Sequence, residues 1–374
     1  MVTDWLRFFR LLHQQPRDSR RVNWAEIKQL LKKRLLSPRI RQRPAHPNPP
    51  VLFHIASAFW LSQAVYVAAK LGIADVLADG PQSSGKLAFA TGSNKESLRR
   101  LMRTLSSAGV FERVDDDHFA LARIGEGLQS AVPGSLRDTV ITLGEIHYQA
   151  CGELLYSVQT GCPAFNQVFG ASLFRYLENN ADASDSFNRG MSNLSAMLAY
   201  AILLAYDFRD VSWIVDVGGG EGKLLQKILD FYPGLHGVVF DSARTIETVR
   251  RKSQTRPRCS YLKGNFFESV PEGADLYLLC GVLHDWDDEH ASQILKNCRS
   301  AMANNGKLLL VEMVVPSTNS PDFSKLLDLN MLVMNGGRER TKAEFAALLE
   351  EAGYQLARTI STLAPQSIIE AVPR

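Results

Sequence analysis

The chain has 374 residues, of which 45% are apolar and 22% are charged, so a disordered or fibrous protein is excluded. The length predicts two or three domains. The longest nearly continuous apolar run, 196–206, is shorter than the roughly 20 residues of a membrane span, and five cysteines without a C-x-x-C pair argue against a disulfide framework or a zinc module. Together these features predict a cytoplasmic protein.

Residues 1–50 form a basic N-terminal extension. Residues 1–48 carry twelve Lys and Arg against three Asp and Glu, whereas the rest of the chain carries 30 and 36. Two short amphipathic segments, around Trp5 and Trp24, precede a linker with four prolines at 43–50. Such helices can cover apolar surface on the body or on a partner subunit, contact a membrane weakly through residues 1–40, or bind nucleic acid.

Residues 51–130 have the pattern of a helical domain with a wing. Apolar residues at helical spacing predict a long buried helix over 59–73 and a second helix over 98–110. Two short strands, 109–114 and 118–121, flank an acidic turn and predict a hairpin. The following segment, 131–206, has a helical pattern throughout from residue 135.

Residues 207–374 change to alternating strands and helices. A short connection joins the last two strands, which makes them antiparallel neighbours. The prediction is an α/β domain with a doubly wound parallel sheet, helices on both faces and an antiparallel C-terminal strand. The predicted strands are 214–217, 238–241, 276–279, 307–312, 354–360 and 367–372, with helices at 223–232 and 246–252.

A glycine loop follows the first of these strands, where such sheets bind their ligands. Asp216 is followed by Gly218, Gly220 and Gly222, but residue 223 is lysine, where a dinucleotide fingerprint needs glycine, and no P-loop serine or threonine follows it. Asp241 ends the second strand and can accept hydrogen bonds from ribose hydroxyls. The alternative is a purely structural glycine turn.

Several further blocks recur with this loop in a fixed order. They are Gly264-Asn265-Phe266-Phe267, Leu283-His284-Asp285-Trp286-Asp287-Asp288, Lys296-Asn297-Cys298, Val311-Glu312 and Gly336-Gly337-Arg338-Glu339-Arg340-Thr341. From residue 51 onward the chain resembles the S-adenosylmethionine-dependent O-methyltransferases of the caffeic acid and hydroxyindole type. The resemblance implies a class I methyltransferase sheet, a winged-helix dimerisation domain, a homodimer, a small hydroxylated natural product as substrate, S-adenosylhomocysteine as product, and no metal.

The resemblance also implies site residues. His284 matches the general base, and Glu312 and Glu339 match the glutamates that flank it. Cofactor contacts fall on Asp216, Gly218, Gly220, Asp241, Asn265, Phe266, Cys280, Ser195 and Trp286, and substrate contacts on Phe187, Met191, Met331 and Asn335. Asn265 stands where the family usually has Asp, and Cys280 where plant members often have a larger, charged residue.

The chemistry explains why a base is needed. Methyl transfer is an in-line displacement, and a phenol of pKa ~10 is mostly neutral at pH 7, so an imidazole with its ordinary pKa near 6.5 would assist. On simpler readings His284 is a capping or core residue, Glu339 pairs with Arg338 or Arg340, and Asp285 caps the helix that begins near Asp287.

Two other functions stay open. A repurposed relative would bind S-adenosylmethionine but methylate nitrogen or carbon, hydroxylate, or rearrange its substrate. A winged-helix regulator would bind nucleic acid, but the acidic body has the wrong sign for phosphate contacts, so no nucleic-acid partner is expected.

Overall fold

The computed structural model describes residues 49–252, 258–303 and 305–374. The predicted basic extension therefore lies outside the described residues, apart from its last two. Backbone contacts separate the chain up to Ala64 from a second unit, Val65–Arg374, and the two are described in turn.

The first unit contributes the beginning of helix α3 (Pro49–Lys70), whose apolar side chains are largely exposed. Leu52, Ile55 and Trp60 are 68%, 68% and 60% exposed, and Phe59, expected to be buried, is 45% exposed. By length and composition alone, Val51–Lys70 would suit a membrane span. The length of the longest apolar run did not reveal this, because His54, Ser57, Ser62 and Gln63 interrupt the apolar residues of this helix. The prediction that this helix is buried is therefore wrong for the beginning of α3 in a single subunit.

The second unit begins with a small winged domain. A three-stranded sheet has the order β1-β3-β2, and β3 pairs antiparallel with both neighbours. Leu98, Met102 and Leu105 bury one face of α6, and Asn94 caps that helix by accepting a hydrogen bond from the Ser97 amide. The predicted wing is confirmed. Its elements are α4 (Ile73–Val76), β1 (Gln82–Ser83), α5 (Ser84–Thr91), α6 (Lys95–Ser107), β2 (Phe111–Arg113) and β3 (His118–Leu121).

The helical pattern of the next segment is also confirmed, with breaks at glycines. Gly161 and Gly170 end two helices with φ of +73° and +72°, in the left-handed region that favours glycine. A five-residue π-helical stretch, η3 (Leu143–His147), joins α7 to α8. The helices are α7 (Arg137–Thr142), α8 (Tyr148–Gly152), α9 (Leu154–Thr160), α10 (Ala164–Phe169), α11 (Leu173–Asn179) and α12 (Ala181–Ala205).

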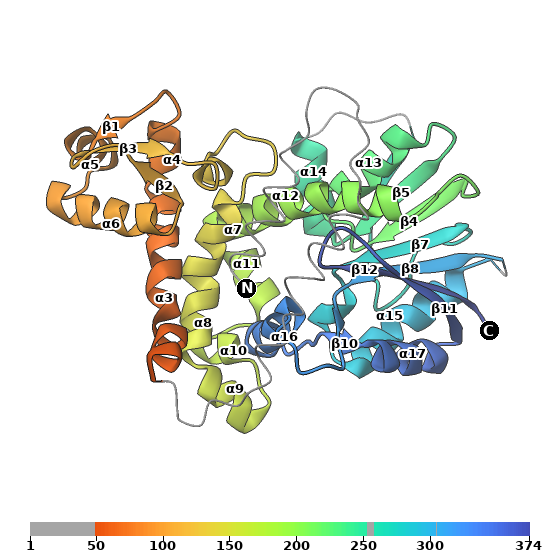
Figure 1. Ribbon diagram of the computed structural model, residues 1–374. Helices are drawn as coiled ribbons and strands as arrows, with labels where there is room; N and C mark the ends of the chain where they lie inside the picture. The colour runs from red at the N-terminus through yellow and green to blue at the C-terminus, as the bar shows by residue number, and fades with distance from the viewer. Residues whose placement is uncertain (1–48, 253–257, 304) are drawn as a thin grey trace. The chain divides into compact units, whose positions relative to one another are not determined.

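A seven-stranded sheet forms the centre of the second unit, with the order β11-β12-β8-β7-β4-β5-β6 (Figure 1). The pairs from β8 to β6 are parallel, and β12 runs antiparallel to both β8 and β11, as predicted. The edge strand β6 was missed, because only one of its five residues is buried. The strands are β4 (Trp213–Val217), β5 (His236–Asp241), β6 (Cys259–Lys263), β7 (Leu276–Cys280), β8 (Lys307–Glu312), β11 (Tyr354–Ser361) and β12 (Ser367–Pro373).

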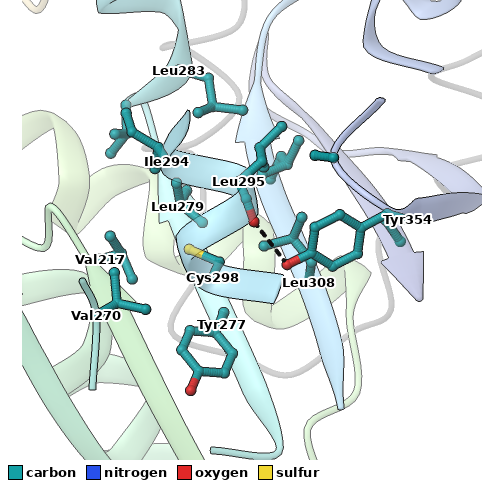
Figure 2. Close-up of a cluster of buried hydrophobic side chains, with 14 of the residues drawn as sticks. Val217, Val270, Tyr277, Leu279, Leu283, Ile294, Leu295, Cys298, Leu308 and Tyr354 are labelled. Carbon is teal, nitrogen blue, oxygen red and sulfur yellow. Dashed lines mark hydrogen bonds between the residues drawn. The ribbon is translucent and has the colours of Figure 1, made fainter. Parts of the chain in front are cut away.

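Helices cover both faces of this sheet. Helices α15 (Asp288–Ala301) and α17 (Lys342–Glu351) pack on one face, while α12, α13 (Lys223–Phe231) and α14 (Ala243–Lys252) pack on the other. Figure 2 shows part of the apolar core between the sheet and α15, where Leu279 and Leu308 pack toward that helix. In the same core the Tyr354 hydroxyl donates a hydrogen bond to the Leu295 carbonyl at 3.3 Å. The buried sheet leaves its carboxyl edge as the place where polar side chains gather.

Candidate active site

Two glutamates are brought together by a short parallel ladder beside the main sheet. Glu312 is the last residue of β8, and β9 (Val314–Val315) follows after one residue. β9 pairs with β10 (Arg340–Thr341), with Val314 opposite Arg340. Glu339 immediately precedes β10, so this register places the two carboxylates beside each other. Their side chains are 1% and 0% exposed.

His284 completes the cluster from the 3₁₀ turn Leu283–Asp285, which follows β7. Its Nδ1 lies 2.8 Å from Glu339 Oε1 and 3.9 Å from Glu312 Oε2. A carboxylate can only accept, so Nδ1 carries the proton and Nε2 holds the lone pair when the ring is neutral. Nε2 is 3.8 Å from Asp285 Oδ1, beyond hydrogen-bond distance. The sequence-predicted trio therefore lies in one place, with the imidazole oriented by Glu339.

Glu312 is fixed mainly by the backbone. Its Oε1 accepts hydrogen bonds from the Val282 and Leu283 amides at 3.1 and 2.9 Å, which ties the strand end to the turn that carries His284. Its Oε2, and Oε2 of Glu339, are buried without a hydrogen-bond partner. Each carboxylate thus has one oxygen that accepts a hydrogen bond and one buried oxygen that accepts none. The second oxygen is stabilised by the positive charge of a protonated His284 nearby.

The electrostatics of the cluster favour a protonated histidine. Burial lowers the pKa of His284, but the charges of Asp285, Glu312 and Glu339 outweigh it and raise the pKa to about 10. Burial raises the pKa of Glu312 to about 7, with His284 opposing and Glu339 adding to the rise. The pKa of His284 thus lies above the unperturbed value near 6.5, because three carboxylates from separate segments face one ring.

Two of the simpler readings of this region, those of Asp285 and Glu339, do not match the contacts. Asp287, not Asp285, caps α15 by accepting from the His290 amide at 2.9 Å. Asp285 instead accepts from the Asn335 side-chain amide at 2.6 Å. The arginines beside Glu339 pair elsewhere, Arg338 with Asp288 and Glu344, and Arg340 with Asp288.

The glycine loop lies at the same edge of the sheet, between β4 and α13. Gly218 has φ of +71°, and a Cβ there would be 2.8 Å from Val282 Cγ2. The Gly220 amide donates to Asp241 Oδ2 at 2.9 Å, and open space surrounds the position of a Cβ on Gly220. Asp216 is 1% exposed, and its Oδ2 has no hydrogen-bond partner. Burial and the Asp241 charge raise the pKa of Asp216 to about 7.

The other predicted cofactor residues lie in different settings. The rings of Phe266 and Trp286 pack edge to face with centroids 6.1 Å apart. Both ends of the Asn265 side chain are already used, since Nδ2 donates to Glu268 and Oδ1 accepts from the Phe267 amide. Cys280 ends β7, and burial raises the pKa of its thiol, so it is neutral. Ser195 lies on α12, half-buried.

The predicted substrate residues come from two helices. Phe187 and Met191 lie one turn apart on α12, where Phe187 packs on an apolar cluster and Met191 is 39% exposed. Met331 is buried on α16 (Phe323–Met334), and Asn335 caps that helix. Of the four, Asn335 is tied directly to the turn of His284, through Asp285.

Within the described ranges, one cluster also has the spacing of metal ligands. One atom each of His284, Glu312 and Glu339 lie within 4.8 Å of one another. The contacts present are a direct imidazole–carboxylate hydrogen bond and two backbone bonds to Glu312. This arrangement suits a shared proton.

Sequence reasoning missed two residues that shape the site. Arg340 is fully buried, and a Cβ on Gly337 would lie 2.0 Å from the His284 carbonyl oxygen. Both belong to the motif that carries Glu339. The motif itself was visible in the sequence. The residues that Gly337 and Arg340 contact lie about 50 residues earlier in the chain, however, and no spacing rule connects the two segments.

Comparison with known proteins places this geometry in a family. A model described as the O-methyltransferase domain matches residues 152–355, and one described as the O-methyltransferase dimerisation domain matches residues 53–127. The phenazine O-methyltransferase PhzM of Lysobacter antibioticus is 40% identical over 332 residues, covering 88% of this chain and 97% of that protein. The phenazine-1-carboxylate N-methyltransferase of Pseudomonas aeruginosa is 32% identical, covering 83% and 92%.

A solved structure agrees. The O-methyltransferase NcsB1 from neocarzinostatin biosynthesis, in complex with S-adenosylhomocysteine and 1,4-dihydroxy-2-naphthoic acid, has a TM-score of 0.73 and 32% identity, covering 88% of this chain and all of that one. The chain therefore belongs to the O-methyltransferases of the caffeic acid and hydroxyindole type, enzymes that take their methyl group from S-adenosylmethionine.

Proposed function

We propose that this enzyme methylates a phenolic or enolic hydroxyl of a small, largely apolar natural product, with His284 as the general base. The observation that carries the proposal is the 2.8 Å hydrogen bond from His284 Nδ1 to the buried Glu339, which leaves Nε2 to act on an acceptor. The phenazine O-methyltransferase named among the relatives, and the dihydroxynaphthoic acid bound in the NcsB1 structure, support the substrate class.

The glycine loop fits the cofactor that the family uses. The unpartnered Asp216 oxygen suits a positively charged group, and the open space beside Gly220 and Asp241 suits a ribose. A carboxylate can accept about four hydrogen bonds, so Asp241 can hold the Gly220 and Ser242 amides and still accept from hydroxyls. Bound S-adenosylmethionine supplies a methyl group that is already activated as a sulfonium.

The protein's own contribution is to align the acceptor and to take its proton. His284 Nε2 accepts the hydroxyl proton, the imidazolium is stabilised by Glu339 and Glu312, and the acceptor oxygen gains the charge it needs. A pKa of about 10 for His284 is close to that of a simple phenol, so proton exchange between them is nearly balanced.

The raised pKa fixes the sign of the pH dependence. The neutral imidazole is the active form, and it is lost as the pH falls through the folded pKa. Because that pKa is above 6.5, the rate rises with pH on the alkaline side of neutrality, between about 7 and 10. Acceptors with more acidic hydroxyls should depend less on this rise.

Methylation of nitrogen is the second candidate, because the Pseudomonas relative is named an N-methyltransferase. A ring nitrogen already has a lone pair and needs no base, so such an enzyme need not keep His284 against two buried glutamates. The retained trio of His284, Glu312 and Glu339 supports oxygen as the acceptor.

We also propose a homodimer in the cytoplasm that needs no metal. The exposed apolar face of α3 lies in the region matched by the dimerisation model, so a second subunit is the expected cover. The cysteines are free thiols, which suits a reducing compartment: Cys151, Cys162, Cys259, Cys280 and Cys298.

The deciding experiment compares wild type with His284→Ala on a panel that includes 1,4-dihydroxy-2-naphthoic acid and a hydroxyphenazine. Product mass and the site of the new methyl group separate O- from N-methylation. Loss of the base should lower kcat by ~10²–10⁴-fold and leave S-adenosylhomocysteine binding nearly unchanged. Near-normal kcat in the variant, or a product methylated on nitrogen, would refute the proposal.

A further inference from the structure

Arg340 is a fully buried arginine whose hydrogen bonds converge on the turn that carries His284. Its Nη1 donates to the Leu283 carbonyl and its Nη2 to the Trp286 carbonyl, each at 2.9 Å. Its Nε donates to Asp288 Oδ1 at 2.9 Å. The side chain therefore spans the turn from the residue before His284 to the start of α15.

The same loop holds the turn at a second point. The Arg338 amide donates to the His284 carbonyl at 2.9 Å. Gly337 makes this approach possible, because a Cβ there would lie 2.0 Å from that carbonyl oxygen. Glu339, between these contacts, bonds the imidazole itself. One short segment thus holds the backbone of the turn and its side chain.

We propose that Arg340 is a positioning residue for the base, acting through the Leu283 and Trp286 carbonyls to fix where His284 Nε2 points. This inference rests on the proposed role of His284. The guanidinium makes its bonds as a planar fork, and no other cation can reach three acceptors in these directions at once. A lysine at this position keeps the charge and loses the fork.

The effect of losing the fork follows from geometry. The backbone bonds of Glu312 and of Arg338 would keep the turn folded against the loop, but without its two carbonyl anchors the turn can shift locally. A displacement of about 1 Å in a reacting group can cost on the order of 10²-fold in rate. Arg340→Lys should therefore lower kcat by about 10- to 100-fold and leave the KM for S-adenosylmethionine nearly unchanged.

Arg258 offers a matched control at the other end of the sheet. It precedes β6, and its Nη1 donates to the Tyr232 and Leu235 carbonyls, each at 3.0 Å. Arg258→Lys removes an arginine that also ties two backbone carbonyls, but far from His284. It should lower the melting temperature and leave kcat within about twofold of wild type.

The test is a double-mutant cycle on the full-length enzyme with 1,4-dihydroxy-2-naphthoic acid or the fastest acceptor of the panel. Arg340→Lys, His284→Ala and the double variant are compared for kcat, pH profile and S-adenosylhomocysteine binding. A positioning residue has nothing left to position once the base is gone, so Arg340→Lys should cost less than about threefold in the His284→Ala background.

The outcomes separate the two claims. If His284→Ala keeps full activity, the proposed base is wrong. If it loses activity but Arg340→Lys costs as much without His284 as with it, the base stands and the positioning role is overturned. Should Arg340→Lys fail to fold, Gly337→Ala moves the same turn with Arg340 intact. An unchanged kcat and pH profile in Gly337→Ala would then overturn the inference.

Discussion

Replacing Glu339 by glutamine removes one negative charge from His284 while keeping an oxygen that can accept from Nδ1. The wild-type bond is 2.8 Å long, and the glutamate is buried with no other side-chain partner for its second oxygen. Hydrogen bonds to charged groups are worth ~1.5–3 kcal/mol, and one pH unit corresponds to ~1.36 kcal/mol. Glu339→Gln should therefore lower the pKa of His284 by about one to two pH units.

The assay is the pH profile of kcat on a phenolic acceptor. In wild type, the limb of the profile, where kcat rises with pH, should lie near the raised pKa of His284, about 10. In the variant this limb should move toward lower pH. At pH values above the limb, Glu339→Gln should lower kcat by less than His284→Ala does, because the imidazole is still present, although less well oriented. Glu344→Gln is the matched control. Glu344 completes the capping box of α17 and accepts a hydrogen bond from Arg338, and it does not contact His284. Glutamine can also complete a capping box, so this variant should keep the helix end intact.

Two results would refute this reasoning. A limb that stays at the wild-type position in Glu339→Gln would show that the group titrating in the profile is not His284. A limb that moves to higher pH would show that the glutamate does not stabilise the imidazolium. Thermal unfolding of each variant checks that the buried amide has not disrupted the fold.

Three further outcomes are expected. Asp241→Ala should weaken S-adenosylhomocysteine binding by ~1.5–3 kcal/mol in isothermal titration, and an unchanged dissociation constant would remove this carboxylate from the cofactor site. Dialysis against EDTA should leave the activity unchanged, whereas a loss that added zinc or magnesium restores would assign the His284, Glu312 and Glu339 cluster to a metal. Trp60→Glu should convert a dimer into a monomer by light scattering, because it places a charge on the exposed apolar face of α3, and a persistent dimer would place the interface elsewhere.

The sheet was predictable because its strands are short apolar runs bounded by polar residues. Strand β8 was predicted with its observed ends, since Lys307 and Glu312 flank a run in which every residue is buried. Strand β6 was missed because an edge strand alternates too weakly to stand out. Hydropathy predicted α3 as an apolar helix but could not tell burial within a subunit from cover by a partner.

The sequence could predict which residues form the site but not their contacts or their pKa values. His284, Glu312 and Glu339 come from motifs, and the structure brings them together. The pKa of His284 depends on three carboxylates meeting at one ring, which no local pattern contains. The role of Asp285 was open for the same reason, because its partner Asn335 comes from another helix. Arg340 escaped notice because its partners belong to a distant turn.

The proposed base and the acceptor-facing candidates come from different parts of the second unit, which has a practical consequence for protein engineering. The trio around His284 is built from strand ends and one loop, whereas Phe187, Met191 and Met331 lie on helices. Residues on those helices can be randomised to broaden the range of acceptors without altering the trio of His284, Glu312 and Glu339. Asn335 is the exception, because its hydrogen bond to Asp285 joins the helix end to the turn of the base. A library that spares this asparagine should retain a larger fraction of active clones than one that varies it.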